Sequence, residues 1–494
     1  MQPRVQKVVI AGGGTAGWMA GAALAKMLGK NLQITLVESE EIGTVGVGEA
    51  TIPTLHIFHR LLGIKEAEFM AATNATFKLG IAFEHWHDID KHYIHSFGFL
   101  GKDCWACGFQ HFWRRGVQLG VASQIGDYCV EHLAAREGRF AVLPNQDLNH
   151  AYHMDAGLYA KFLRQLAEQH GLKRIEGKID QVLQHDDGAI KALQLQDGQL
   201  IEGDLFLDCT GFRGLLIEQA LHTGYDDWSH WLPCDSAVAV QTKTVSAPVA
   251  YTRSIAHDSG WQWRIPLQSR VGNGMVFCSK YWSDDFAKQK LLENIEGEPL
   301  MMPKVLKFRT GTRRKHWNKN VVAIGLSSGF LEPLESTSIH LIQRNVIRLL
   351  QMFPSYGIQP ADIAEFNRQA QQEMENIRDF IILHYKQTDR SDSPFWRYCQ
   401  SMPVPESLQH RLDLYAQTGR VYKIGLELFG EASWLQVMIG QGLMQQQYHP
   451  IVDAMSPEEL RDFLDKIKAN VRKTVSGYPD VNDFIRHYCQ TAVQ

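Results

Sequence analysis

Three glycines near the N-terminus have the spacing of a phosphate-binding turn. An apolar run over residues 8–11 leads into a G-x-G-x-x-G sequence, and a stretch rich in Ala and Leu follows. In such a turn the first glycine permits the tight bend, the second lets a pyrophosphate approach the backbone, and the third lets helix pack on strand. The free N–H groups of the helix then bind the pyrophosphate. The residues predicted to bind a dinucleotide here are Gly12, Gly14, Thr15, Ala16 and Gly17.

An acidic residue follows at the distance expected for ribose recognition. The apolar run 34–37 reads as a second strand and ends in Glu38, 21 residues after Gly17. A carboxylate at that point accepts hydrogen bonds from the ribose hydroxyls of an adenosine. The fingerprint by itself does not distinguish FAD from NAD.

The elements after residue 150 favour FAD. Asp155 is placed to cap a helix with Leu158, Phe162 and Leu166 on one face, and two Asp-Gly turn signals then separate short β runs. A buried strand over residues 204–208 follows, and Asp208 at its end is a further predicted cofactor contact. This order indicates an α/β FAD-binding fold of the glutathione-reductase and p-hydroxybenzoate-hydroxylase type, because NAD dehydrogenases usually continue with more βαβ units.

Beyond this core, the pattern changes twice. Residues 76–83 and 238–281 have β character, residues 88–122 read as loops and short elements over a pocket, and residues 321–325 form one more buried strand. After Pro360, apolar residues recur at steps of three and four, which predicts a buried helical stripe. We therefore predict an FAD-binding body with an inserted β-rich region over residues 1–350, and a helical C-terminal part over 351–494 that covers the substrate site.

Composition excludes several classes of protein. The 494 residues carry a net charge of −4, and 45% are hydrophobic. Without a basic field, nucleic acid is not expected as a partner. Because no stretch is long and apolar enough to span a bilayer and no signal peptide is recognisable, we expect a cytoplasmic protein without membrane association. The oligomeric state stays open, with a homodimer compatible with the sequence.

Eight scattered cysteines suit a reducing compartment. Cys104 and Cys107 form a C-x-x-C pair, but no second pair follows at the spacing of a zinc ribbon. The sequence favours structural or incidental thiols over a metal or redox role, and no metal site is predicted.

Four stretches together resemble the flavin-dependent tryptophan halogenase family. They are Gly12-Gly-Gly-Thr-Ala-Gly-Trp18, Gly46-Val-Gly-Glu-Ala-Thr-Ile-Pro53, Trp261-x-Trp263-x-Ile265-Pro266, and Pro333-Leu-Glu-Ser-Thr337. The W-x-W-x-I-P element is distinctive of these enzymes. With Lys78 in its Phe-Lys-Leu-Gly setting, the resemblance runs from residue 8 to about 345.

The resemblance implies a two-stage reaction. Reduced FAD, oxygen and a halide ion, chloride or bromide, yield hypohalous acid, which moves through an internal tunnel to a lysine beside a separately bound aromatic substrate. Lys78 is then the catalytic lysine and Glu335 the carboxylate near it. Further cofactor contacts implied are Gly48, Glu49, Ala50, Gly325 and Leu331, and the residues implied to line the flavin side and tunnel are Trp261, Trp263, Pro266 and Ser336.

Elementary chemistry supports the same two residues. Hypohalous acid is a small and indiscriminate electrophile, so one fixed amine that binds it, or becomes a haloamine, directs it to one ring carbon. The cationic intermediate of aromatic substitution is stabilised by a nearby carboxylate, which can then take the ring proton. Each residue also has a purely structural alternative. Lys78 would then be a lysine at a strand edge whose amine reaches water. Glu335 would complement the dipole of a helix over residues 337–352.

The start of that helix is the candidate halide site. Free N–H groups at Thr337 and Ser338 suit an anion that needs donors and a positive potential. In the tryptophan halogenases a glycine follows the threonine, whereas this chain has Ser338. The extra side chain narrows the halide pocket or restricts the backbone angles. We therefore consider a preference for bromide over chloride as a hypothesis.

The substrate is less closely defined by the sequence. His95 and Phe97 resemble the aromatic clamp of the indole site, with a loop packing pair as the alternative. The Tyr-Tyr and Glu residues that hold the amino-acid end of tryptophan in the family have no match, and residues 325–327 read Gly-Leu-Ser where relatives have Gly-Asn-Ala. We expect an electron-rich, indole-like small-molecule substrate.

No second nucleotide fingerprint is present, so reduced flavin is expected to diffuse from a separate flavin reductase. Two other functions stay open at this point. One is an aromatic hydroxylase of the same fold, which would need no distant lysine. The other is a flavin-binding protein whose site has decayed.

Overall fold

The computed structural model describes residues 4–41, 48–142 and 148–490. Gly46 and Val47 of the second motif lie outside the described residues. A six-stranded sheet carries the N-terminal glycine turn, and its inner strands are parallel. In spatial order the strands are β20 (Trp317–Asn318), β21 (Val321–Ala323), β12 (Leu205–Asp208), β1 (Lys7–Ala11), β2 (Gln33–Glu38) and β8 (Lys173–Glu176).

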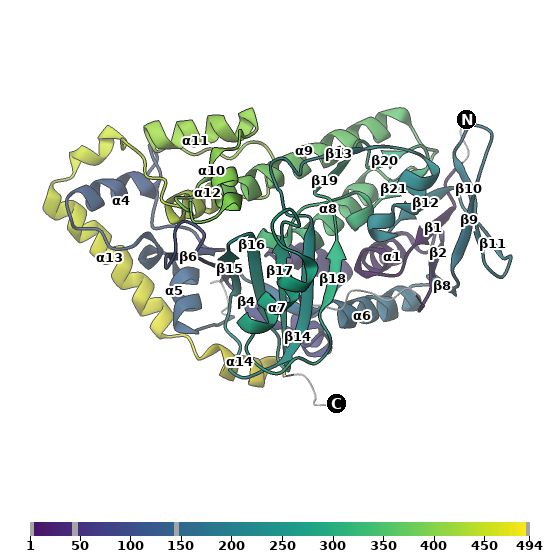
Figure 1. Ribbon diagram of the computed structural model, residues 1–494, viewed down its shortest axis with the longest axis horizontal. Helices are drawn as coiled ribbons and strands as arrows, with labels where there is room; N and C mark the ends of the chain where they lie inside the picture. The colour runs from purple at the N-terminus through teal and green to yellow at the C-terminus, as the bar shows by residue number, and fades with distance from the viewer. Residues whose placement is uncertain (1–3, 42–47, 143–147, 491–494) are drawn as a thin grey trace.

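Three helices lie beside this sheet, and the first of them packs against the other two (Figure 1). They are α1 (Thr15–Leu28), α6 (Ala156–Gln169) and α8 (Ser338–Gln351). Asp155 caps α6 as predicted, because its side chain accepts a hydrogen bond from the Leu158 N–H. The buried face is one position further along than predicted, on Tyr159, Leu163 and Ala167, while the predicted residues are half-buried.

The predicted antiparallel meander, which favours FAD over NAD as the cofactor, is present. It consists of β9 (Ile179–Gln184), β10 (Ile190–Leu195) and β11 (Leu200–Glu202). Gly188 and Gly198 take positive φ angles in its two turns, which is the role that glycine has in an Asp-Gly turn. The chain then enters β12 and so returns to the nucleotide sheet beside β1.

A second, seven-stranded sheet fills the centre of the molecule, and only its β15–β5 pair is parallel. Its order is β18 (Lys304–Lys307), β14 (Ser236–Lys243), β17 (Arg270–Phe277), β16 (Gly260–Pro266), β15 (Thr252–His257), β5 (Gly80–Glu84) and β6 (His92–Ser96). A small sheet packs against it through β3, with the order β3 (Gly48–Ala50), β7 (Ala151–Asp155) and β4 (Thr76–Lys78).

Two regions of the sequence prediction are defined more closely here. The β character of residues 76–83 is confirmed, but as two strands, because the chain passes from β4 to β5 at Leu79, whose N–H donates to the Ala250 carbonyl. Residues 88–122 consist of loops and short elements, as predicted, and the elements are β6 and the helix α4 (Phe109–Gln118). Other elements are α2 (Leu55–Leu62), α3 (Glu66–Ala72), α5 (Val130–Glu137), α7 (Asp284–Asn294), β13 (Tyr225–Asp227), β19 (Gly311–Arg313) and β22 (Gly329–Phe330).

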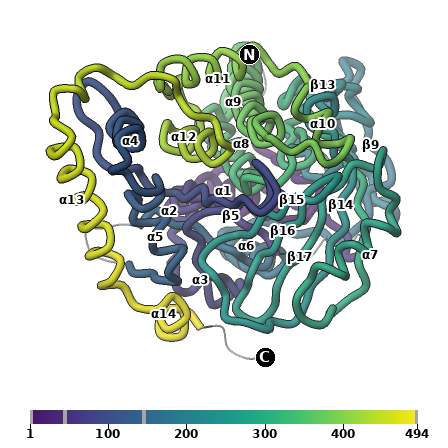
Figure 2. The backbone as a smooth tube through the Cα atoms, turned by 60° about the vertical axis from the view of Figure 1, so that its left-hand side comes forward, coloured from purple at the N-terminus to yellow at the C-terminus, as the bar shows by residue number. Residues whose placement is uncertain are grey.

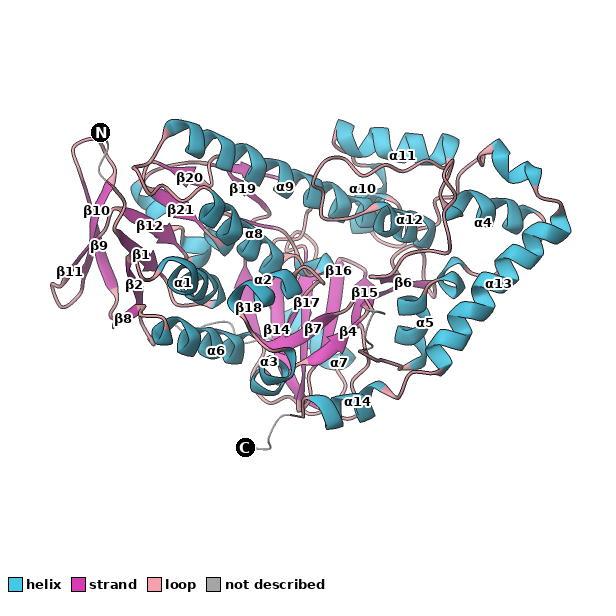
Figure 3. Ribbon diagram, turned by 180° about the vertical axis from the view of Figure 1, so that it is seen from behind, coloured by secondary structure: helices cyan, strands magenta, loops and turns pink. Residues whose placement is uncertain are grey.

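The chain after residue 350 is helical, as predicted. Its helices are α9 (Pro360–Lys386), α10 (Pro394–Ser401), α11 (Glu406–Thr418), α12 (Glu431–Gly440), α13 (Pro457–Ser476) and α14 (Val481–Tyr488). Figure 3 shows α9 running from the nucleotide sheet toward α10 and α12, and Figure 2 shows α13 beside α4 and α5. Ser456 and Glu459 form the capping box at the start of α13.

The buried stripe of α9 joins the two largest cores. Phe366 and Ala370 belong to the core under the nucleotide sheet, whereas Ile377 and Ile381 belong to the core around Trp261. The division near residue 350 stays a prediction about chain organisation, since both of these cores contain residues from either side of it. Among the described residues, no helix is long and apolar enough to cross a membrane.

Candidate active site

In the glycine turn, the position of Gly14 has open space beside it, whereas Gly12 and Gly17 are packed closely against neighbouring atoms. A Cβ on Gly12, whose φ is +106°, would lie 2.4 Å from the Cys209 carbonyl oxygen, and one on Gly17 would lie 1.9 Å from the Gly12 carbonyl oxygen. A Cβ on Gly14 would meet no atom within 4 Å. Because Gly14 also precedes the N-terminus of α1, open space and free N–H groups coincide where a pyrophosphate would bind. These residues therefore fit FAD.

Glu38 lies against the same turn. A Cβ on Gly13 would lie 1.5 Å from Glu38 Oε2, so the missing side chain at Gly13 lets this carboxylate approach. The other oxygen, Oε1, accepts a hydrogen bond from Arg174 Nε at 2.5 Å. Glu38 is therefore held at the turn with one oxygen paired, which is compatible with its predicted contact to a ribose.

Three other predicted cofactor contacts have different surroundings. Gly325 lies beside α1, where a Cβ would be 2.9 Å from Ala16 Cβ, and Leu331 is buried in the core. Asp208 accepts four hydrogen bonds from its own chain, two from Thr210 and one each from the Leu216 and Ile217 N–H groups. Its carboxylate thus shapes the turn after β12, and a direct contact to the cofactor would have to displace one of these donors.

Lys78 is fully buried at the end of β4. Its Nζ donates to the Thr51 carbonyl oxygen at 3.0 Å and to Ser336 Oγ at 2.7 Å. Burial lowers the pKa of Lys78 to about 7, although the charge of Glu335 acts in the opposite direction. The alternative of a lysine that reaches water is excluded, because the side chain is fully buried and its amine is bonded to Thr51 and Ser336.

Glu335 is buried and bracketed by two histidines. His95 Nδ1 lies 2.9 Å from Oε2, and His384 Nε2 lies 2.8 Å from Oε1. Burial alone raises the pKa of Glu335, but the charges and hydrogen bonds of His95 and His384 outweigh it and bring the pKa to about 2. The carboxylate therefore stays ionised at neutral pH within a low-dielectric setting.

The segment after Glu335 turns sharply into α8. Ser336 has a φ of +59° in the left-handed region, and α8 begins at Ser338 with Thr337 as its N-cap. Within the described part of the chain, the buried Thr337 Oγ1 has no hydrogen-bond partner. A free hydroxyl beside the N–H groups of the first helical turn is a suitable environment for an anion.

The two signature tryptophans are buried in β16, with ring centroids 6.0 Å apart. Trp261 Nε1 donates to Glu332 Oε2 at 2.9 Å, and Tyr385 Oη donates to the same oxygen at 2.5 Å. At the end of the strand, the Pro266 carbonyl accepts a hydrogen bond from Thr76 Oγ1 at 2.7 Å. Gly48 packs on Ile265, since a Cβ there would lie 3.2 Å from Ile265 Cγ2. The predicted tunnel segment therefore contacts the predicted cofactor segment directly.

The two predicted clamp residues occupy different positions around the lysine. The Phe97 ring faces Lys78 Nζ, with the ring centroid 5.3 Å away. His95 is fixed by its Nδ1 contact to Glu335, and its buried Nε2 has no partner among the described residues. His95 is thus joined to the carboxylate through one of its two ring nitrogens.

Sequence reasoning missed two buried groups at this site. Glu332 holds the Trp261 indole, and burial raises its pKa to about 7 against the hydrogen bonds from Tyr385 and Trp261. His384, on α9, holds Glu335. The first could have been suspected from its place in the Glu332-Pro333-Leu334-Glu335 run, whereas His384 is nearly 50 residues from Glu335 in the sequence and no local pattern marks it.

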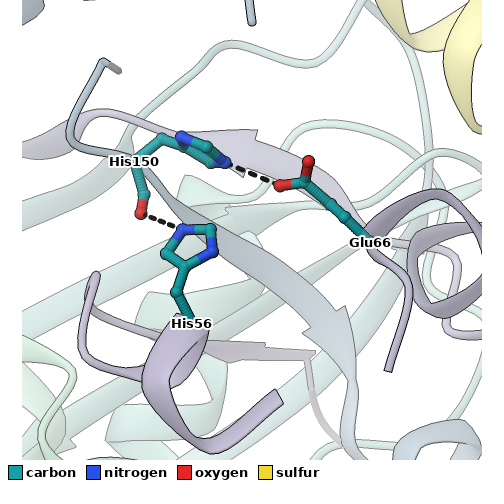
Figure 4. Close-up of side chains that lie close together, drawn as sticks. All are labelled: His56, Glu66 and His150. Carbon is teal, nitrogen blue, oxygen red and sulfur yellow. Dashed lines mark hydrogen bonds and ion pairs between the residues drawn. The ribbon is translucent and has the colours of Figure 1, made fainter. Parts of the chain in front are cut away.

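Three residues behind the strand of Lys78 have spacing that could hold a metal ion. They are His56, Glu66 and His150, shown in Figure 4. His56 Nε2 donates to the His150 carbonyl oxygen at 2.8 Å, and His150 Nε2 lies 2.7 Å from Glu66 Oε1. His150 Nδ1 contacts the Leu148 carbonyl. Because these nitrogens are engaged by protein acceptors, the arrangement serves as a hydrogen-bond network.

The fold and the site together define a class of protein. A nucleotide sheet with room for FAD occurs together with a buried lysine, whose amine is bonded to Thr51 directly after β3, and with a carboxylate that two histidines hold. Solved structures similar to this chain include flavin-dependent halogenases. One from Xanthomonas campestris, Xcc4156, is 59% identical with a TM-score of 0.98 over 100% of both chains. BrvH from Brevundimonas sp. BAL3 is 44% identical with a TM-score of 0.95 over 99% of this chain and 100% of that one.

The tryptophan halogenase family model matches residues 7–457, and the chain belongs to this family. Tryptophan 7-halogenase RebH of Lentzea aerocolonigenes is 32% identical over 98% of this chain and 99% of that protein. The protein is therefore a flavin-dependent halogenase. Enzymes of this class use reduced FAD with a halide, and they generally need a separate flavin reductase and an aromatic substrate.

Proposed function

We propose that this enzyme halogenates an electron-rich, indole-type aromatic compound by delivering hypohalous acid through Lys78. The observation that carries the proposal is the position of Lys78 Nζ, which is bonded to Thr51 on the cofactor side and to Ser336 beside Glu335. When bound, reduced FAD supplies electrons that reduce molecular oxygen, and the halide is oxidised to hypohalous acid in the same reaction. The remaining chemistry belongs to the protein's own side chains.

Lys78 directs the oxidant because it is fixed and partly neutral. Its Nζ donates hydrogen bonds to the Thr51 carbonyl oxygen and to Ser336 Oγ, so the amine is held in one place. With a pKa of about 7, the amine is available at neutral pH in both forms. The ammonium can hydrogen-bond hypohalous acid, and the neutral amine can take the halogen as a haloamine. In either form the halogen is presented at one place.

Glu335 supports the substitution step. Attack on the ring leaves a cation, and an ionised carboxylate in a water-poor site stabilises it strongly. The ring proton can then pass to Glu335, since the cation is a far stronger acid than any carboxylic acid. His95 and His384 hold the carboxylate in place throughout.

The halide site is proposed at the start of α8, with Thr337 Oγ1 and the first N–H groups as donors. Ser338, in the first turn of this helix, places a side chain where relatives have glycine, and we propose that it favours bromide. When both halides compete for one aromatic substrate at equal concentration, the brominated product should dominate. Chlorination at the same rate would refute this part of the proposal.

His95 and Phe97 are proposed as substrate contacts. The unpartnered Nε2 of His95 offers one polar contact to a ligand, and the Phe97 ring offers a stacking surface close to Lys78. The remaining assigned residues, Gly48, Glu49, Ala50 and Pro266, are proposed to contact the flavin.

A product screen tests this function. Reduced FAD from an added flavin reductase, oxygen and bromide are supplied with a panel of indoles, phenols and pyrroles, and products are identified by mass spectrometry. We expect bromide-dependent brominated products, with indoles prominent among them. Hydroxylated products formed equally well without halide would instead identify a hydroxylase, and the absence of any product across the panel would identify a decayed site.

A further inference from the structure

The eight cysteines fall into two groups. Six are buried, namely Cys129, Cys209, Cys234, Cys278, Cys399 and Cys489, whereas Cys104 and Cys107 are partly exposed. Burial raises the pKa of every buried thiol. Because the thiolate is the reactive form, these six are chemically quiet at neutral pH. The reactive sulfur of this protein is concentrated in one pair.

The pair is arranged for a reaction between its members. Cys104 Sγ and Cys107 Sγ are 3.7 Å apart, and the Cys107 N–H donates to Cys104 Sγ at 3.3 Å. The Cys104 N–H in turn donates to the Cys107 carbonyl, which closes the four-residue loop. Asp103 Oδ1 accepts a hydrogen bond from the Phe109 N–H at 2.7 Å and so fixes the loop to the start of α4. A disulfide requires about 2.05 Å between sulfurs, which a small side-chain rotation can reach from this geometry.

The two thiols differ in character. Burial raises the pKa of Cys104, but hydrogen bonds from the backbone of Ala106 and Cys107 and from the Cys107 thiol lower it overall. Burial, the Cys104 sulfur and the charge of Asp103 raise the pKa of Cys107 to about 12. One sulfur is thus suited to attack as a thiolate, and the other stays protonated beside it.

A metal role is not supported by the surroundings. A tetrahedral metal site needs two more ligands besides the two thiols. Over the described ranges, the group of histidine, cysteine and acidic side chains with ligand spacing is the His56, Glu66 and His150 network, which does not include either cysteine.

We propose that Cys104 and Cys107 form a reversible dithiol–disulfide pair that is oxidised by hydrogen peroxide. Reduced flavin that meets oxygen in solution yields this oxidant, so an enzyme that depends on diffusing reduced FAD works in its presence. The Cys104 thiolate attacks one peroxide oxygen, the O–O bond breaks, and a sulfenic acid and hydroxide form. The Cys107 sulfur then displaces the hydroxyl group as water. Two electrons leave the two sulfurs, and in total one peroxide becomes two molecules of water.

Counting accessible thiols in the folded, full-length protein tests this proposal. The reduced protein should accept two maleimide groups under native conditions. After treatment with hydrogen peroxide it should lose two hydrogens by intact mass and accept none, and dithiothreitol should restore both sites. Peptide mapping should join Cys104 to Cys107. Thiols that stay fully reactive after peroxide, oxygen addition without a cross-link, or a cross-link between other cysteines would each overturn the proposal.

Single variants test the order of events. In Cys107→Ser, a 1,3-diketone that traps sulfenic acids should label Cys104 after peroxide treatment, because the second thiol is missing. In Cys104→Ser, reaction with peroxide should be at least tenfold slower. Equal rates in the two variants would contradict the assignment of Cys104 as the attacking sulfur. Because the loop lies at the surface, both variants should fold, and a thermal melt of each variant provides the control.

Discussion

Lys78 and Glu335 are both buried, yet their environments act on them in opposite ways. The lysine lies among neutral acceptors, so burial lowers its pKa, whereas two histidines keep the carboxylate ionised. The result is a reactive amine beside a permanent negative charge. Neither state would be stable without the specific partners, because an unpaired buried charge costs several kcal/mol.

Replacing the carboxylate tests its role in the substitution step. Glu335→Gln keeps the shape and removes the charge, so we expect halogenation of indole to slow by about 10²-fold. Oxidation of reduced FAD should continue at the rate of the unchanged enzyme, since Glu335 takes no part in that step. Glu293→Gln, on an exposed part of α7, is the control. Unchanged product formation in Glu335→Gln would remove this residue from the mechanism.

His384 should act by positioning that carboxylate. Its Nδ1 is hydrogen-bonded to the Phe380 carbonyl, and its Nε2 lies 2.8 Å from Glu335 Oε1. Without the His384 contact the pKa of Glu335 should rise, since that contact lowers it. We expect His384→Asn to move the acid limb of the halogenation rate to higher pH, as a pH–rate profile would show. A pH–rate profile with lower rates throughout but with its acid limb at the original pH would indicate that His384 has a general structural role.

At the scale of elements, the glycine turn offers two neighbouring positions with opposite requirements. Gly14→Ala should leave the apoprotein as stable as before, because its Cβ meets no protein atom, but should weaken FAD binding by about tenfold or more. Gly17→Ala should destabilise the fold itself by roughly 1–3 kcal/mol, because its Cβ would overlap the Gly12 carbonyl. Denaturation without cofactor and titration with FAD separate the two effects. Equal stability losses in both variants would contradict the cofactor placement.

The elements themselves were largely predictable wherever a local rule applied. The glycine turn, the cap at Asp155 and the stripe of α9 follow from spacing alone. The break at Leu79 could not be predicted, because it depends on a hydrogen bond to Ala250, far away in the sequence. Likewise the site residues on α9 are recognisable only once the helix lies across the second core. Short-range patterns define elements, and long-range packing brings Lys78, Glu335 and His384 together.

For the whole molecule, buried histidines make stability depend on pH. Burial lowers the pKa of His59 and His316 to about 3 and of His132 and His257 to about 4. Between these values and the unfolded value near 6.5, the unfolded chain binds more protons, so stability falls as the pH falls. Glu332 and Glu49, whose pKa values burial raises to about 7, act in the opposite direction between about pH 4.5 and 7.

We therefore expect the unfolding temperature to fall steeply as the pH is lowered from 6.5 toward 4. His316→Asn should reduce this dependence by roughly 1–3 kcal/mol of unfolding free energy over the same range, since one pKa unit corresponds to about 1.4 kcal/mol. Thermal unfolding at a series of pH values measures both. An unfolding temperature that rises on acidification would mean that Glu332 and Glu49, whose pKa values are raised, dominate the pH dependence.

The central claim is that the oxidant reaches the substrate through Lys78. In the direct measurement, reduced FAD, oxygen and bromide are supplied, and indole and a soluble halogen scavenger compete for the oxidant. In Lys78→Met we predict that brominated indole falls by at least 10²-fold while scavenger bromination continues, with Lys161→Met on the surface of α6 unchanged in both. Bromination of indole by Lys78→Met at the original rate and the same ring carbon would contradict the account.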